Sequence, residues 1–163
     1  MTMRIVVMGV SGCGKSTVGK MLASKLSAKF VDGDDLHPEE NKAKMAAGIA
    51  LNDDDRWGWL DSVAETLESA DRVIVACSAL KVVYRERIKA ASPGTVFVHL
   101  SGSRSVLESR LNNRKDHFMP ASLLDSQLST LQPLGPDERG VVIDIDKSID
   151  AIVDEALSFL KLD

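Results

Sequence analysis

Short runs of apolar residues recur along the chain, and segments in which apolar positions are three and four apart separate them. A continuous run rich in Val and Ile is typical of a buried strand, whereas the spacing of three and four predicts an amphipathic helix. The predicted strands are residues 4–8, 29–31, 73–77, 95–100 and 141–145. The predicted helices are residues 15–26, 38–47, 52–69, 80–90, 103–113, 120–130 and 148–160.

Strands that are apolar along their whole length are usually covered on both faces. Their alternation with helices predicts an α/β fold, a three-layer α/β/α sandwich on a mostly five-stranded parallel sheet. With 163 residues, 44% of them hydrophobic, the chain suits one domain over residues 1–163. Ligands of such sheets bind beyond the carboxyl ends of the strands, so we expect the chemistry just after residues 8, 31, 77, 100 and 145.

Charge and cysteine content narrow the classes of protein. A formal net charge of -4 argues against a nucleic-acid partner, which requires a basic surface. The two cysteines, Cys13 and Cys77, do not suggest a disulfide framework and favour a reducing compartment. No run approaches the ~20 apolar residues of a membrane span, and residues 1–8 do not resemble a signal peptide. We therefore expect a cytoplasmic protein without a membrane partner.

Residues 9–16 fit the phosphate-loop pattern G-x-x-x-x-G-K-[ST], between a predicted strand and a predicted helix. The glycines let backbone N–H groups curl around phosphate oxygens, and the helix N-terminus favours negative charge. Lys15 is expected to reach the β- and γ-phosphates of ATP, and Ser16 to bind Mg²⁺. The predicted nucleotide-binding residues of the loop are Gly9, Val10, Ser11, Gly12, Cys13, Gly14, Lys15, Ser16 and Thr17.

Cys13 lies inside this loop, close to Lys15 and to the positive end of the following helix. Such surroundings favour the thiolate, so we expect alkylation of Cys13 to block ATP binding. The alternative is that Cys13 is only a small residue that the loop accommodates.

Three carboxylates, Asp32, Asp34 and Asp35, follow the second predicted strand. Without compensation they would repel ATP, so a divalent cation and an alcohol acceptor would explain them. One carboxylate can hold Mg²⁺, and another can accept the proton of an attacking hydroxyl. The alternative is a solvated acidic turn in which an aspartate caps a helix.

The chain lacks features of nucleotide switches and motors. The closest string to the Asn-Lys-x-Asp motif that reads guanine is residues 41–44, which lacks the aspartate and falls in a predicted helix. The strand at 73–77 is followed by Ser78 and does not end in the aspartate of a usual Walker B motif. A transferase is therefore favoured over a GTPase.

Cationic side chains follow the third predicted strand. Ser78 stands at its end, and Lys81, Tyr84 and Arg85 are spaced i, i+3 and i+4, which predicts one helix face. A hydroxyl, an ammonium, a phenol and a guanidinium together suit a polyhydroxylated anion. An ordinary cationic surface face is the alternative.

A second cationic group, Arg110 and Arg114, is four residues apart on a predicted helix that leads into residues 115–120. We expect a mobile lid over approximately residues 114–130. Its closure would expel water and bring an arginine to the transferring phosphoryl group. Solvated helix arginines are the alternative.

Taken in order, these strings resemble the gluconate kinase family of phosphate-loop kinases, relatives of the shikimate and adenylate kinases. The resemblance covers nearly the whole chain. The phosphate loop alone is generic, whereas DGDDLHP at 32–38 and CSALKVVYR at 77–85 are far more specific.

The resemblance implies a P-loop kinase that transfers the γ-phosphoryl group of ATP to the 6-hydroxyl of D-gluconate, with Mg²⁺, as a homodimer. It implies that Asp34 touches the acceptor, Asp32 joins Ser16 at the metal, and Arg110 lies against adenine. The predicted catalytic residues are Lys15, Asp34 and Arg114. The predicted acceptor-binding residues are Asp34, His37, Lys44, Arg56, Ser78, Lys81, Tyr84 and Arg85. A related sugar-acid or shikimate-type kinase, and a nucleotide-binding regulator without transfer activity, remain as alternatives.

Overall fold

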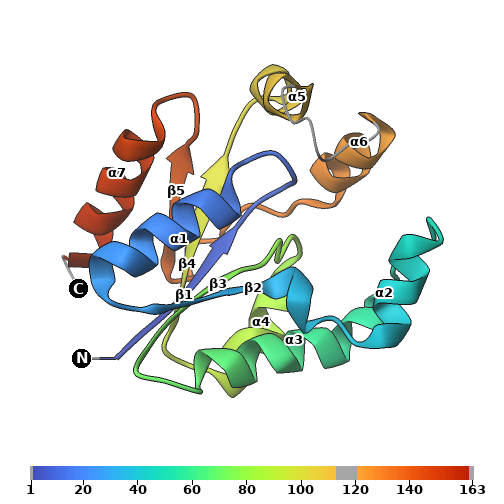
Figure 1. Ribbon diagram of the computed structural model, residues 1–163, viewed down its shortest axis with the longest axis horizontal. Coiled ribbons are helices and arrows are strands. Elements are labelled where there is room, and N and C mark those ends of the chain that lie inside the picture. The colour runs from blue at the N-terminus through green and yellow to red at the C-terminus, as the bar shows by residue number, and fades with distance from the viewer. Residues whose placement is uncertain (1, 113–120, 162–163) are drawn as a thin grey trace.

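The computed structural model describes residues 2–112 and 121–161 of the chain (Figure 1). Its strands form one parallel sheet in the order β2-β3-β1-β4-β5, which confirms the predicted α/β fold with a five-stranded parallel sheet. The strands are β1 (Met3–Met8), β2 (Lys29–Asp32), β3 (Arg72–Ala76), β4 (Thr95–Ser101) and β5 (Gly140–Asp144).

Helices cover both faces of the sheet, α1 and α7 on one side and α3 and α4 on the other (Figure 1). The helices are α1 (Lys15–Leu26), α2 (Glu39–Ala46), α3 (Asp53–Leu67), α4 (Val82–Ala91), α5 (Arg104–Asn112), α6 (Ala121–Thr130) and α7 (Ile149–Lys161), with a 3₁₀ turn η1 at Gly33–Leu36. Among the described residues, no helix is both long enough and apolar enough to cross a membrane.

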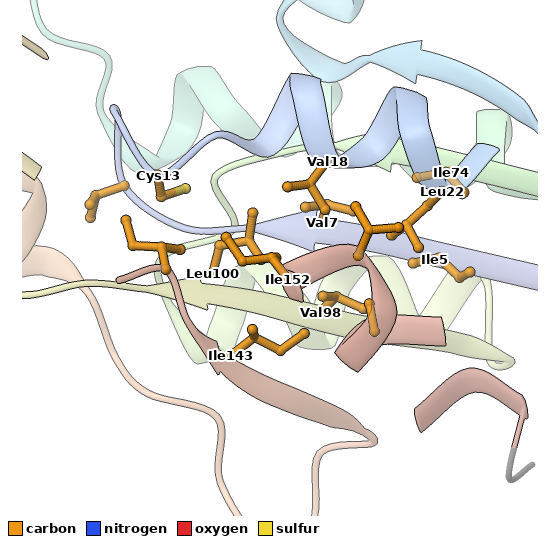
Figure 2. Packing of buried hydrophobic residues seen from close by; sticks show 14 of the residues in the cluster. Ile5, Val7, Cys13, Val18, Leu22, Ile74, Val98, Leu100, Ile143 and Ile152 are labelled. Atoms are coloured by element: carbon orange, nitrogen blue, oxygen red, sulfur yellow. The ribbon is translucent and has the colours of Figure 1, made fainter. Parts of the chain in front are cut away.

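Alternate residues of the inner strands β1, β3 and β4 enter two separate cores, because successive side chains of a strand point to opposite faces. Ile5 and Val7 of β1 pack toward α1 and α7 (Figure 2), whereas Val6 and Met8 pack toward α3 and α4. Full burial of one such side chain contributes about 1.5–3 kcal/mol before the entropy of ordering is subtracted. The apolar runs of β1, β3 and β4 thus correspond to strands that are buried on both faces. The run at 141–145 differs, because in the edge strand β5 Ile143 is buried but Val142 is exposed.

The connections of two neighbouring strands diverge at the carboxyl edge of the sheet, and the expected place of a ligand, here called the crevice, lies between them. β1 and β3 are paired, with Val7 beside Ala76. The chain leaves β1 toward α1 on one face and leaves β3 toward α4 on the other (Figure 1). This reversal is the usual place for a ligand in an open parallel sheet. It sets the loop at 9–14 beside residues 77–81, where Gly9 N–H donates to the Ser78 carbonyl at 3.3 Å.

Candidate active site

The phosphate loop adopts a backbone that depends on its glycines. Gly9, Gly12 and Gly14 have φ values of 145°, 90° and 90°, which side chains with a Cβ rarely adopt. A Cβ at Gly9 would also lie 2.7 Å from the Leu100 carbonyl oxygen. No side chain caps the first turn of α1, so its N–H groups are left for an anion.

Asp32 joins the phosphate loop to the acidic turn. Ser16 Oγ donates to Asp32 Oδ2 at 3.3 Å, and Asp34 N–H donates to Asp32 Oδ1 at 3.0 Å. Lys15 Nζ donates a hydrogen bond to the Gly9 carbonyl oxygen at the start of the loop, at 3.0 Å. The hydroxyl of Ser16 and the carboxylate of Asp32 are adjacent oxygen donors, a set that fits a hard cation such as Mg²⁺.

The turn that carries Asp34 packs closely against strand β3 of the sheet. A Cβ at Gly33 would lie 2.4 Å from the Ala76 carbonyl oxygen, so only glycine fits there. Trp59 Nε1 donates to the Gly33 carbonyl at 2.7 Å. Although Asp34 is exposed overall, desolvation of its carboxyl group and repulsion from Asp32 raise its pKa, against an opposing effect of Lys15. A carboxyl group in such surroundings is better matched to accepting a proton than an ordinary aspartate.

A mixed-charge cluster lies on the other side of the crevice, where three predicted acceptor-binding residues meet Asp53. Lys81 Nζ lies 3.1 Å from Asp53 Oδ1, and Tyr84 OH donates to the same oxygen at 2.5 Å. Arg56 Nη1 donates to Tyr84 OH at 2.8 Å. The hydrogen bonds from Tyr84 and Lys81 lower the pKa of Asp53. Sequence reasoning missed Asp53 because the start of a helix already explains an aspartate there.

Lys44 and His37 are held beside this cluster by Asp55 and Asn41. Lys44 Nζ lies 2.8 Å from Asp55 Oδ1. Asn41 Nδ2 donates to the Asp55 carbonyl at 2.8 Å and contacts His37 Nδ1 at 3.1 Å. His37 Nδ1 is therefore an acceptor and its Nε2 carries the proton. The ring is buried and stacks on Trp59, with the ring centroids 4.2 Å apart.

Arg85 corrects the expectation that it contacts a bound acid. Its side chain is fully buried, with Nε 2.5 Å from Glu138 Oε2. Its guanidinium also donates to the carbonyls of Ala79 and Gln132, each at 2.8 Å. Adjacent helix positions point in different directions: Tyr84 is buried with its hydroxyl in the mixed-charge cluster, whereas Arg85 lies beside Glu138. Arg85 is a structural residue that ties the loop at 77–81 to the segment before β5.

The helix around Arg85 also begins later than predicted. It starts at Val82, because Lys81 at its N-cap has an extended backbone with φ -105° and ψ 147°. Ala79, earlier in the same loop, also departs from helical geometry, with a positive φ of 44°. Ser78 accordingly lies in a loop, and its carbonyl accepts from the phosphate loop.

Cys13 corrects a second expectation. The residue is fully buried among Leu100 and neighbouring core residues (Figure 2). Burial raises the pKa of the Cys13 thiol and outweighs the opposing effect of Lys15. The thiol is therefore neutral and enclosed, which argues against the reactive thiolate that its position in the loop suggested.

Arg110 lines an open hollow of about 420 Å³ beside the phosphate loop. Its Nη2 donates to the Ile145 carbonyl at 2.6 Å. Arg114 and the first part of the expected lid fall in residues 113–120, which lie outside the described residues. The lining residues of the hollow are Ser105, Val106, Ser109, Arg110, Asp146 and Lys147.

Gln127 of α6 is a further residue that sequence reasoning missed. Its Oε1 accepts a hydrogen bond from Ser11 N–H at 2.7 Å, across 116 residues of chain. The only sequence signal for Gln127 is the pair Ser126-Gln127, which resembles the gluconate kinase family but by itself indicates no role. Thr17, the last predicted residue of the nucleotide set, is exposed in the first turn of α1.

The lowered pKa values of two buried histidines predict how the stability of the fold depends on pH. Burial lowers the pKa of His37 to about 4, helped by Arg56 and Lys42. Burial and Arg85 lower the pKa of His99 of β4 to about 4. Between pH 6.5 and 4 the unfolded chain therefore binds protons that the folded chain does not, so stability falls as pH falls through this window.

Each histidine contributes up to about 3 kcal/mol to this loss of stability. The raised pKa of Asp34 opposes the trend. The depressed pKa of groups such as Asp53 adds to it at lower pH. Urea unfolding at several pH values should show a shallower pH slope in His99→Leu than in the unmodified chain, and an unchanged slope would contradict the assignment.

Comparison with known proteins identifies the family of this chain. The shikimate kinase family profile matches residues 11–161. The thermoresistant gluconokinase of Escherichia coli is 43% identical, covering 96% of this chain and 92% of that protein. The gluconokinase of Gluconobacter oxydans is also 43% identical, covering 94% and 88%. A crystal structure of a gluconokinase from Sinorhizobium meliloti superposes with a TM-score of 0.92 at 48% identity, covering 98% of this chain and 92% of that one. The chain therefore belongs to the gluconokinase family, within the shikimate-kinase type of phosphate-loop kinases.

Proposed function

We propose that this chain phosphorylates D-gluconate at its 6-hydroxyl with ATP, giving 6-phosphogluconate and ADP, in one kinase domain over residues 1–163. The observation that carries the proposal is the contact of Ser16 with Asp32. It brings a phosphate loop and an acidic turn into one site, as a phosphoryl transfer to an alcohol requires.

In the proposed reaction the 6-hydroxyl oxygen attacks the γ-phosphorus in line, and the bond from that phosphorus to the β,γ-bridging oxygen breaks. Asp34 orients the hydroxyl and takes its proton. Lys15 and backbone N–H groups of the loop stabilise the charge on the phosphoryl oxygens. Ser16 and Asp32 would hold Mg²⁺, which neutralises charge on the β- and γ-phosphates when bound. Arg114 is assigned to the phosphates by family resemblance alone.

The mixed-charge cluster supports a sugar acid as the acceptor. Arg56 and Lys81 provide two cations and Asp53 one carboxylate, so the cluster carries one net positive charge. Tyr84 OH adds a hydroxyl to the same group. One net cation beside a phenol suits a monocarboxylate with several hydroxyls better than a neutral sugar. Ser78, Lys44 and His37 remain the proposed neighbours of this cluster, and Arg85 is no longer one of them.

We place the adenine of ATP in the hollow beside Arg110. The hollow borders α5 and the loop after β5. A Cβ at Gly14 of the phosphate loop would lie 3.8 Å from Arg110 Nη1. That proximity supports a path from the loop into the hollow.

The proposal is tested by coupled measurement of ADP release from Mg-ATP with D-gluconate, other sugar acids, shikimate and nucleoside monophosphates. We expect gluconate-dependent turnover that Lys15→Ala abolishes. Turnover with a different acceptor alone would reassign the substrate. ATP binding without any acceptor-dependent turnover would instead support a regulatory protein.

We also propose, on the family resemblance, that the protein acts as a cytoplasmic homodimer. Both cysteines are free and buried, as suits a reducing compartment. Sedimentation equilibrium should give twice the chain mass of 17.6 kDa. A single-chain mass at micromolar concentration would contradict the dimer.

A further inference from the structure

The tip of the phosphate loop, Ser11 and Gly12, is held by two helices that are distant in sequence. On one side Ser11 N–H donates to Oε1 of Gln127 on α6 at 2.7 Å. On the other side Gly12 lies against α5, where an added Cβ would be 3.0 Å from Leu111 Cγ. The tip therefore has one polar and one apolar support, and both come from outside the loop.

The other contacts of the loop lie nearer its ends or within it. Gly9 N–H donates to the Ser78 carbonyl at 3.3 Å, and Cys13 N–H donates to the Val10 carbonyl at 3.3 Å. Lys15 Nζ lies 3.2 Å from the Val10 carbonyl oxygen. None of these contacts involves Ser11 or Gly12. Among the described residues, the tip is therefore supported by α5 and α6.

The N–H group of Ser11 is distinct from those that suit a phosphate. The first-turn N–H groups of α1 have no intrahelical partner and no side-chain cap, which leaves them for an anion. Ser11 precedes the N-cap, Gly14, by three residues and already has an acceptor within the protein. Gln127 is thus placed to support the loop without taking the position of the phosphate.

The helix that carries Gln127 is itself braced against the acceptor side of the crevice. Leu131 N–H donates to the Gln127 carbonyl at 2.9 Å, and Gln132 N–H donates to the Leu80 carbonyl at 2.7 Å. Gln132 Oε1 accepts from Val82 N–H at 2.7 Å. The amide of Gln127 therefore projects from a fixed support.

Such a support matters because the loop contains three glycines with positive φ. Glycine loses more conformational freedom on ordering than any other residue. A loop that is already ordered before ATP arrives avoids part of that cost at the moment of binding. We propose that Gln127 is a positioning residue for the phosphoryl donor, holding the tip of the phosphate loop in the conformation that receives ATP.

The test is Gln127→Met, which keeps the length of the side chain and removes the acceptor. We expect the Kd of a non-hydrolysable ATP analogue, and the KM of ATP, to rise about two- to tenfold, the range for one lost neutral hydrogen bond. The KM of the acceptor should stay unchanged. Amide exchange of Ser11, followed by NMR without nucleotide, should become faster.

Gln127→Glu separates the hydrogen bond from other effects. Its carboxylate can accept from Ser11 N–H, so slow amide exchange should return, while its charge still weakens ATP binding. Ser129→Ala, at an exposed position of the same helix, is the matched control and should change none of these quantities. Gln127→Asn is too short to reach Ser11 and replaces Gln127→Met if that variant does not fold.

Unchanged ATP affinity and unchanged Ser11 exchange in Gln127→Met would overturn the proposal. Tighter ATP binding would also overturn it, because Gln127 would then compete with the nucleotide. An equal rise in the KM of the acceptor would point to general loosening of the site and would overturn it as well. The Kd of the ATP analogue is measured without an acceptor. It therefore tests the role of Gln127 even if the acceptor is not gluconate.

Discussion

Replacing Asp34 with asparagine is expected to lower kcat by about 10²- to 10⁴-fold, the usual contribution of a positioned general base. Asparagine keeps the shape of the side chain and can still contact the hydroxyl, but it cannot take the proton. A loose transition state makes deprotonation late and places the loss toward the lower end of this range. Steady-state kinetics should show the loss in kcat, and calorimetry should show Mg-ATP binding close to that of the unmodified chain.

Asp35→Asn is the matched control for Asp34→Asn. Asp35 is an exposed aspartate in the same 3₁₀ turn, so the substitution removes the same charge from almost the same place. We expect its kcat to stay near that of the unmodified chain. Equal losses in the two variants would mean that the negative potential of the turn matters and that Asp34 is not the base.

Replacing Arg85 with methionine is expected to destabilise the fold by about 3–5 kcal/mol, the typical cost of breaking a buried ion pair. The side chain is fully buried, and the side chain of Glu138 is only 11% exposed. Burial would raise the pKa of Glu138, but the hydrogen bond from Arg85 holds it below its usual value. Without Arg85, the buried carboxylate of Glu138 would lose its paired cation and keep the hydrogen bond from Gly135 N–H, and the carbonyl of Ala79 would lose its guanidinium donor. Urea unfolding measures the loss, which is large against a typical total of about 5–15 kcal/mol.

Two further variants test this origin of the instability. Arg85→Met combined with Glu138→Gln should recover part of the loss, because no unpaired charge remains buried. Arg87→Met removes an arginine from the same helix whose partner, Asp61, is exposed, and should cost less than about 1 kcal/mol. Similar losses for Arg85→Met and Arg87→Met would show that burial of the pair is not the cause.

The order of strands and helices was predictable because each depends on a local pattern. Strands buried on both faces carry unbroken apolar runs, and most predicted boundaries lie within two residues of those in the structure. The main error around the site was the helix expected from Leu80, which begins at Val82. Lys81 has an extended backbone there and Ala79 a positive φ, and neither residue type indicates such a conformation in the sequence.

What the sequence determined by itself was the local chemistry of the site. The glycines of the phosphate loop, Lys15 and the acidic turn lie in short segments, and the rule that parallel strands end at one edge sufficed to bring them together. The Ser16–Asp32 contact agrees with that expectation.

Only the tertiary structure decided which charged and polar side chains face the crevice and which hold the protein together. Arg85 meets Glu138 across 53 residues, and Ser11 meets Gln127 across 116. The cationic neighbours of Cys13 lower the pKa of its thiol, but burial raises that pKa by more. Desolvation and distant partners are properties of the packed chain. No local pattern contains them, so a guanidinium predicted to bind a sugar acid proved to be part of the core.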